Sequence, residues 1–410
     1  MHTARLSSEP WFKLSALSAV YLVWGAIASL NDLLIPYLKS EFGLNFSGAM
    51  RIQLVFYTAY FLLSIPCGML ARRFGYRNGV LTGLFIAITG CLAMIAASQA
   101  GSYAVVLGAV FILASGITLL QVSANPFATS LGPVKTAPSR LTLVQSFHAL
   151  GTTIGPWFGA ILIFSLAATT ASDALPGTPG RQIWLPYAIL AAMLGGLVLL
   201  FSRIPSGATP GSAAPGRFNP INLVRANRRL LPGTIGIFCY VGAEIAIASL
   251  LVNYLVRPDI AGLGYVSAGK LVSVYWGCAL VGRFVGVGLL RSFRPDRLLA
   301  VYATMAALLL ATTIGSSGNL AAGSVLLIGF FNSIMFPTIF ALTIQHSPAA
   351  DAPGASGVLC LGIVGGAVIT QLQGMLADSV GIQASFTLPL LCYAYIVFLA
   401  TTILKPVNPK

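Results

Sequence analysis

Two carboxylates lie deep inside long apolar segments of the chain, where charged side chains are rare. Asp32 falls within an apolar run that extends, with its flanks, from Leu14 to Leu38, and Glu244 lies in another such run. A carboxylate near the middle of a bilayer costs about 2.5–3.5 kcal/mol on insertion scales, so it usually serves a function. A side chain that gains and loses a proton there can couple that proton to the movement of another solute. We therefore predict that Asp32 and Glu244 are proton-coupling residues, with a packing role as the alternative for each.

Glu244 has a second candidate role. No Lys or Arg is expected close to it at its depth in the membrane, so burial should keep the side chain protonated. A protonated carboxyl group can donate a hydrogen bond to a bound substrate. We favour this role over that of a second titrating site coupled to Asp32.

Uncharged polar residues occur in pairs at helical spacing in the same apolar segments. Gln121 and Asn125 share one helix face at i, i+4, and Gln145 and His148 share one at i, i+3. Carboxamides donate and accept hydrogen bonds in a fixed geometry, which suits the recognition of hydroxyl groups. Because such side chains also join helices inside membranes, packing is the alternative for each. The predicted substrate-binding residues are Gln121, Asn125, Gln145, His148, Asn332, Glu244, Asn31 and Trp24.

Three further residues are expected to act on the helices. Arg283 lies inside an apolar segment and can either reach the membrane surface or pair across helices, so we predict a gating or structural role. Pro126 should break its helix beside Asn125, because proline removes a backbone donor. Pro337 takes the matching position in the second half of the chain, so we predict a gating or structural role for both prolines.

The composition indicates a membrane protein. The 410-residue chain is 57% hydrophobic and 8% charged, whereas soluble domains carry about 25% charged residues. The six cysteines lie in apolar segments without CxxC or Cys/His spacing, so we expect no disulfide framework, metal site or cofactor. HExxH, P-loop and GxSxG motifs are missing, so we do not expect an enzyme. The net charge of +14 lies mainly in short connections between apolar segments, which argues against a nucleic-acid partner.

Twelve apolar segments are long enough to span a bilayer as helices. Seventeen of the 23 Lys and Arg residues lie in the termini and connections on one side, and five lie on the other. The positive-inside rule therefore places both termini in the cytoplasm and the chain in the cytoplasmic (inner) membrane. The expected spans cover residues 14–38, 50–70, 79–98, 103–131, 141–167, 184–202, 232–255, 269–290, 298–315, 320–345, 356–376 and 384–404.

The two sets of six spans look like repeats. A shift of 217 residues places Gly25-Ala26 on Gly242-Ala243, and a shift of 211 places Gln121 on Asn332. Two such halves in the same orientation are typical of the major facilitator superfamily, in which substrates bind between the halves near the midplane. We expect an all-α membrane protein of this fold, with twelve transmembrane helices in two pseudo-symmetric six-helix halves. Its parts would be an N-terminal half at 1–202, a cytoplasmic linker at 203–231 and a C-terminal half at 232–410.

Several motifs make the chain similar to the fucose–galactose–glucose:proton symporter family of that superfamily, over nearly its whole length. In fucose-transporting members an Asp at the Asp32 position carries the proton, so the resemblance implies this role here. Gln121 stands where those members have a Glu, and Glu244 where they have a Gln, which is closer to the glucose/galactose branch. Arg72 departs from the superfamily pattern, in which an Asp is usual. The matching stretches are 24–25, 30–36, 124–127, 131–133, 238–244 and 336–340.

The resemblance implies proton-coupled import of a monosaccharide by alternating access. The expected substrate is a hexose of the glucose/galactose type, with fucose as a further candidate. The expected partners are the sugar, a proton and the lipid bilayer, with the protein acting as a monomer. Two alternatives stay open, namely a proton-linked drug or organic-anion exporter of the same fold and a passive sugar uniporter.

Overall fold

The computed structural model describes residues 10–44, 46–160, 184–205 and 219–406, without the side chains of 31–37, 39–41, 46–50, 156–160 and 266. Every regular element in these ranges is a helix. Helices suit an apolar chain in a bilayer because each satisfies its own backbone hydrogen bonds where no water is present.

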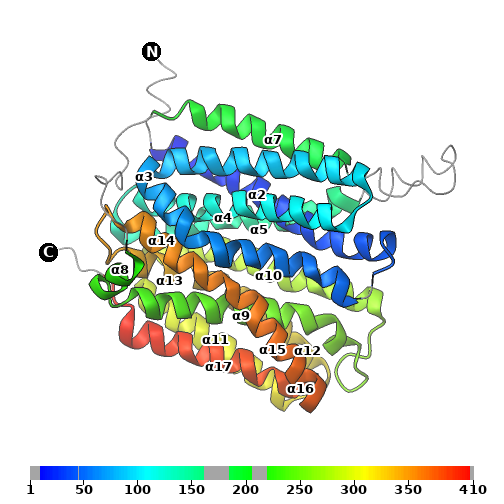
Figure 1. Ribbon diagram of the computed structural model, residues 1–410. Coiled ribbons are helices and arrows are strands. Elements are labelled where there is room, and N and C mark those ends of the chain that lie inside the picture. The colour runs from blue at the N-terminus through cyan, green and yellow to red at the C-terminus, as the bar shows by residue number, and fades with distance from the viewer. Residues whose placement is uncertain (1–9, 45, 161–183, 206–218, 407–410) are drawn as a thin grey trace.

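The long helices run side by side in one bundle (Figure 1). The short helix α8 lies at the end of the bundle where the C-terminus emerges. The first half of the chain contains α2 (Pro10–Glu41), α3 (Phe46–Ala100), α4 (Tyr103–Ser130), η1 (Val134–Thr136), α5 (Ala137–Ala160) and α7 (Trp184–Ser202). The second half contains α8 (Pro220–Ala226), α9 (Leu230–Val256), α10 (Tyr265–Ser292), α11 (Pro295–Gly315), α12 (Gly318–Asn332), α13 (Met335–Ile344), α14 (Ala352–Leu361), η3 (Gly362–Val364), α15 (Gly365–Val380), α16 (Ile382–Ser385), α17 (Thr387–Phe398) and η4 (Leu399–Ile403).

The helices match the expected membrane spans. Ten stretches of the described helices are long and apolar enough to cross a bilayer. One of them, Arg51–Ala100, contains the second and third expected spans, and α5 corresponds to the fifth. Residues 161–167 of that fifth span lie outside the described part. The architecture is therefore that of a twelve-helix membrane protein.

The connection expected at residues 71–78 is shorter than predicted. The two helical parts of α3 meet at Gly75, whose φ of 79° and ψ of 163° are not helical. A positive φ favours glycine, because other residues bring Cβ too close to the backbone there. The two spans are thus joined by a single-residue bend.

The break predicted at Pro126 is wrong, since α4 continues through this residue to Ser130. Proline is tolerated in membrane helices when neighbouring groups satisfy the freed backbone carbonyl. In the second half the break lies at Ser333 and Ile334, between α12 and α13. Pro337 therefore falls in the first turn of α13, where a backbone donor is not needed.

Two pairs of helices approach to backbone contact at glycines. A Cβ on Gly151 of α5 would lie 2.1 Å from the carbonyl oxygen of Leu22 on α2, and one on Gly25 would lie 2.1 Å from a carbonyl oxygen of α5. In the second half, a Cβ on Gly365 would lie 2.0 Å from the carbonyl oxygen of Phe238 on α9. The first and fifth helices thus pack as the seventh and eleventh do, in keeping with the repeat read from the sequence.

Contacts between the two halves gather at one end of the bundle. We call this the basic end, and it holds Gly75, the connections 131–136, 293–294 and 345–351, and residues 203–205 and 219–229.

Two hydroxyl groups join the halves near the basic end. Ser139 Oγ on α5 donates to the carbonyl oxygen of Val287 on α10 at 2.8 Å. Ser356 Oγ on α14 donates to the carbonyl oxygen of Val122 on α4 at 2.7 Å. The halves are therefore closed against each other at this end.

An ion pair lies beside these contacts. Arg72 Nη2 on α3 is 3.4 Å from Asp351 Oδ1, just before α14. Both side chains are partly exposed, and pairs of this kind contribute about 0.2–1 kcal/mol. The backbones of α3 and α14 also approach closely, since a Cβ on Gly357 would lie 2.5 Å from the carbonyl oxygen of Ser64. The ion pair and this packing both join α14 to α3.

The end of the expected linker is attached to the second half. Asn227 Nδ2 donates to Ser347 Oγ at 2.8 Å, and Arg229 Nη1 donates to the carbonyl oxygen of Lys405 at 2.8 Å. The Arg229 guanidinium also contacts the ring of His346. Burial and the neighbouring guanidinium lower the pKa of His346, so this ring is neutral at pH 7.

The glycine contacts predict a stability difference between two Gly→Ala variants. Gly151→Ala should lower the free energy of unfolding by about 1–3 kcal/mol, because the new methyl group meets backbone. Gly108→Ala is the matched control, since nothing lies within 4 Å of its Cβ position, and it should be neutral or stabilising by about 0.4–1 kcal/mol. Thermal unfolding in detergent measures both, and equal melting temperatures would contradict the packing argument.

Candidate functional site

Two tyrosines hold the carboxamides of α4. The hydroxyl of Tyr60 on α3 donates to Gln121 Oε1 at 2.7 Å. The hydroxyl of Tyr21 on α2 donates to Asn125 Oδ1. Both amide oxygens thereby accept a hydrogen bond. Among the described residues none accepts a hydrogen bond from Gln121 Nε2, and Asn125 Nδ2 is buried without a hydrogen-bond acceptor.

Helix α14 of the other half covers this amide pair from the basic end. The Cys360 thiol lies within interaction distance of the Asn125 side chain. Asn125 is fully buried, whereas Gln121, one turn further from the basic end, remains 7% exposed. Gln121 is therefore the more accessible of the two donors.

Trp24 and His148 lie against each other where α2 crosses α5. Their ring centroids are 4.7 Å apart with an interplanar angle of 67°, and Tyr21 packs on Trp24 at 5.1 Å. The glycine contacts between these helices fix that approach, because Gly25 follows Trp24 directly. Gln145, one turn before His148, is buried on the same helix. The predicted residues of α2, α4 and α5 thus belong to one polar region of the N-terminal half.

Asn332 is surrounded by tyrosines in the C-terminal half. Its Nδ2 donates to the Tyr275 hydroxyl at 2.9 Å, and the Tyr393 hydroxyl donates to its Oδ1 at 2.7 Å. Tyr275 in turn reaches the carbonyl oxygen of Glu244 at 3.4 Å. Both ends of the Asn332 carboxamide therefore already have protein partners.

Glu244 lies near a cation, contrary to the expectation from sequence. The Tyr240 hydroxyl interacts with both the Glu244 carboxyl group and the Arg283 guanidinium, and Arg283 acts electrostatically on Glu244. Glu244 Oε1 is buried and has no hydrogen-bond partner among the described residues. The expectation failed because Arg283 comes from another helix, α10, and its long side chain reaches several residues along the bundle.

Arg283 also bridges the two halves. Its Nη1 donates to the carbonyl oxygen of Gln145 on α5 at 3.3 Å, and its Nε donates to that of Ser333 at 3.4 Å. Ser333 lies in the break between α12 and α13. This placement is compatible with the gating role predicted for Arg283.

Asn31 and Asp32 lie on α2, but their side chains fall outside the described part, so their predicted roles remain predictions. The tyrosines that hold the amides were not predicted from the sequence. The repeat could have revealed one pair, because Tyr60 and Tyr275 both lie on the second helix of a half and face the amide of the fourth.

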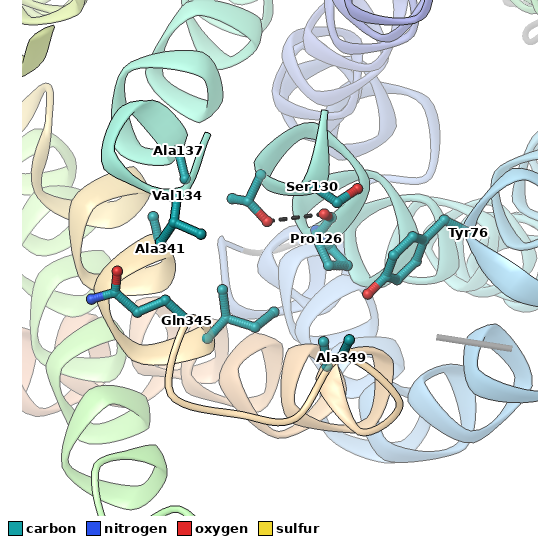
Figure 2. Close-up of a pocket in the computed structure, with 11 residues that line it drawn as sticks. Tyr76, Pro126, Ser130, Val134, Ala137, Ala341, Gln345 and Ala349 are labelled. Carbon is teal, nitrogen blue, oxygen red and sulfur yellow. Dashed lines mark hydrogen bonds between the residues drawn. The ribbon is translucent and has the colours of Figure 1, made fainter. Parts of the chain in front are cut away.

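A cavity of about 180 Å³ opens between the halves at the basic end. Figure 2 shows Tyr76, Pro126 and Ser130 of the N-terminal half on one side of it and Ala341 and Gln345 on the other. It does not include the predicted substrate-binding residues, and we interpret it as part of the vestibule beyond the closed contacts. The described residues contain no group of three His, Cys, Asp or Glu side chains that could hold a metal ion.

Comparison with known proteins places this architecture in a family. The family model of the Major Facilitator Superfamily matches residues 17–370. The chain is 43% identical to the glucose/galactose transporter of Brucella abortus biovar 1 (strain 9-941), covering 97% of this chain and 96% of that one. It is 31% identical to the L-fucose-proton symporter of Escherichia coli (strain K12), with 94% and 91% covered.

A solved structure agrees with these relatives. The crystal structure of FucP, a major facilitator transporter in the outward conformation, superposes with a TM-score of 0.85 at 30% identity, covering 95% of this chain and 97% of that chain. The bundle, the repeated helix packing and these matches together show that the chain is a multi-pass membrane protein that belongs to the major facilitator superfamily.

Proposed function

We propose that the protein imports a monosaccharide together with a proton by alternating access between its two halves. The observation that carries this proposal is the α4 carboxamide pair, whose oxygens are held by tyrosines while the nitrogens have no described protein acceptor. Uncharged donors of this kind suit the hydroxyl oxygens of a sugar. The similarity to glucose/galactose transporters supports a hexose of that type, with fucose as a further candidate.

We further propose that the basic end faces the cytoplasm. The positive-inside rule supports this orientation, with both termini on the cytoplasmic side of the inner membrane. The halves would be residues 1–202 and 232–410, joined by a cytoplasmic linker at 203–231, and the protein would act as a monomer. The contacts at the basic end would then close the cytoplasmic side and leave the substrate site open to the outside.

Our proposed roles follow from this arrangement. Asp32 would take up a proton from the outside, which removes its charge and allows the loaded halves to rock inward. Gln121 would be the first sugar contact, with Asn125, Gln145, His148, Asn332, Glu244, Asn31 and Trp24 as further candidates. Arg283 would stabilise the closed cytoplasmic side, and Pro126 and Pro337 would shape their helices.

Counterflow in proteoliposomes tests the function itself. Vesicles preloaded with D-glucose or D-galactose should take up the labelled sugar, and net uptake should raise the external pH because protons enter with it. Sugar flux without a pH change would indicate a uniporter. Absence of counterflow for every hexose tested, D-glucose, D-galactose and L-fucose included, would overturn the proposal and leave an exporter of the same fold.

Asp32→Asn should abolish proton-driven accumulation while it retains sugar exchange. Asparagine resembles the protonated acid in shape and hydrogen bonding, but it cannot release a proton. Uptake against a sugar gradient and counterflow, measured on the same vesicles, separate the two activities. Unchanged uphill accumulation would exclude Asp32 as the proton carrier.

The Glu244→Gln variant tests in the same assays whether the second carboxylate takes part in proton coupling. A glutamine still donates and accepts, so accumulation and its pH profile should persist if Glu244 only contacts the sugar. Loss of accumulation with intact exchange would instead make Glu244 part of the proton path.

Alternating access also predicts a change in the reactivity of Cys360. This thiol is buried where α14 covers α4, so a variant that retains only Cys360 should react slowly with N-ethylmaleimide. Arg283→Gln removes contacts worth about 1 kcal/mol and should speed labelling about fivefold by opening the cytoplasmic side. A variant that retains only Cys91, buried within the N-terminal half, is the control and should not respond. Equal labelling rates of Cys360 with and without the Arg283→Gln substitution would contradict the proposed gating role of Arg283.

A further inference from the structure

The Tyr60 hydroxyl determines which way the Gln121 carboxamide faces. Its proton has one acceptor among the described residues, Gln121 Oε1, at 2.7 Å. If the amide turned over, Nε2 would donate to the tyrosine oxygen and the tyrosine proton would have no described acceptor. A buried donor left unsatisfied is costly, so the observed orientation is strongly preferred. Gln121 therefore presents its N–H groups, and its oxygen already accepts one hydrogen bond, from Tyr60.

No Asp, Glu, Lys or Arg side chain among the described residues acts electrostatically on Tyr60. Among the described residues, the groups that act on it electrostatically are the phenols of Tyr21 and Tyr57 and the thiols of Cys67 and Cys360. Tyr60 is 2% exposed, so bulk water does not compete for its proton. The buried Tyr60 hydroxyl can therefore set the orientation of the Gln121 carboxamide by a single hydrogen bond.

The second half contains a tyrosine–amide contact with a different set of hydrogen bonds. Asn332, which the repeat places on Gln121, contacts Tyr275 on the second helix of its half, and Tyr393 supplies a second partner. Both the oxygen and the nitrogen of that amide thus have a protein partner. Among the described residues, the Gln121 nitrogen therefore has no acceptor, whereas the Asn332 nitrogen donates to Tyr275.

We propose that Tyr60 is a positioning residue that orients Gln121 so that Nε2 donates to an oxygen atom of the bound sugar. This inference rests on the proposed sugar transport and adds the direction of the hydrogen bond. The oxygen that Gln121 recognises acts as an acceptor, and Tyr60 itself does not touch the sugar. Tyrosine–amide pairing in the second half stabilises the helices there.

A double-mutant cycle on Tyr60 and Gln121 tests the proposal in proteoliposome counterflow. Tyr60→Phe should raise the half-saturating concentration of D-galactose or D-glucose about five- to tenfold, because the amide can then turn. In a Gln121→Ala background the same substitution should change it by less than about twofold, since Tyr60 acts through Gln121. Additive effects would show that Tyr60 contributes independently and would overturn the proposal.

Selectivity between the sugar and its mono-deoxy analogues is a second measurement, and a loss of protein stability does not change it. The parent protein should discriminate against one mono-deoxy sugar, and both Tyr60→Phe and Gln121→Ala should lose discrimination at the same hydroxyl position. Gln121→Met keeps the length of the side chain and the Tyr60 residue, so it tests the donor even if Tyr60→Phe fails to fold. Full discrimination in Gln121→Met would overturn the proposal.

Tyr302→Phe is the matched control for removal of a buried phenol. The Tyr302 hydroxyl is buried in the second half without a hydrogen-bond partner among the described residues, so its loss should leave half-saturation within about twofold. Counterflow of the parent protein separates a failure of the proposed sugar transport from a failure of the proposed role of Tyr60. Its absence would refute sugar transport, whereas normal counterflow with an additive cycle would refute only the role of Tyr60.

Discussion

Close backbone contact between particular helices is the constraint on which the rest of this structure depends. The α2–α5 contact at Gly151 and the α9–α15 contact at Gly365 leave no room for a side chain. Without a hydrophobic force between helices in lipid, van der Waals packing of this kind holds a bundle together. Each contact joins the first helix of a half to its fifth, so each half can behave as one stiff body. Polar side chains next to these crossings, such as Trp24 and His148, therefore keep fixed relative positions.

The two halves use similar packing for different polar chemistry. In the N-terminal half the Gln121 oxygen accepts from the Tyr60 hydroxyl, and no described residue accepts a hydrogen bond from the Gln121 nitrogen. The C-terminal half closes Asn332 with two tyrosines and sets Glu244 near Arg283. One half thus offers the neutral hydrogen-bonding groups of an amide pair, and the other places a carboxyl group near a guanidinium group. A duplicated fold can in this way place neutral hydrogen-bonding groups in one half and ionisable groups in the other.

The sequence predicted the twelve spans and the repeat because apolar length and glycine spacing are local properties. It also placed Gln121 and Asn125 on one helix face, since both lie on α4. It did not predict the cation near Glu244 or the tyrosine partners of the amides, because those contacts join helices far apart in the chain. The break expected at Pro126 failed for a similar reason, since neighbouring helices decide whether a proline interrupts a membrane helix.

The hydrogen bonds that join the halves all end on main-chain acceptors, and this has a consequence for evolution. Ser139, Arg283 and Ser356 each donate across the interface to a main-chain carbonyl oxygen. A carbonyl acceptor survives any substitution of the residue that carries it, Gln145 included. Mutations that alter the lining of the cavity can therefore accumulate without removing the acceptors that hold the closed state. Descendants of this chain could change their preferred solute while they inherit the same closing mechanism.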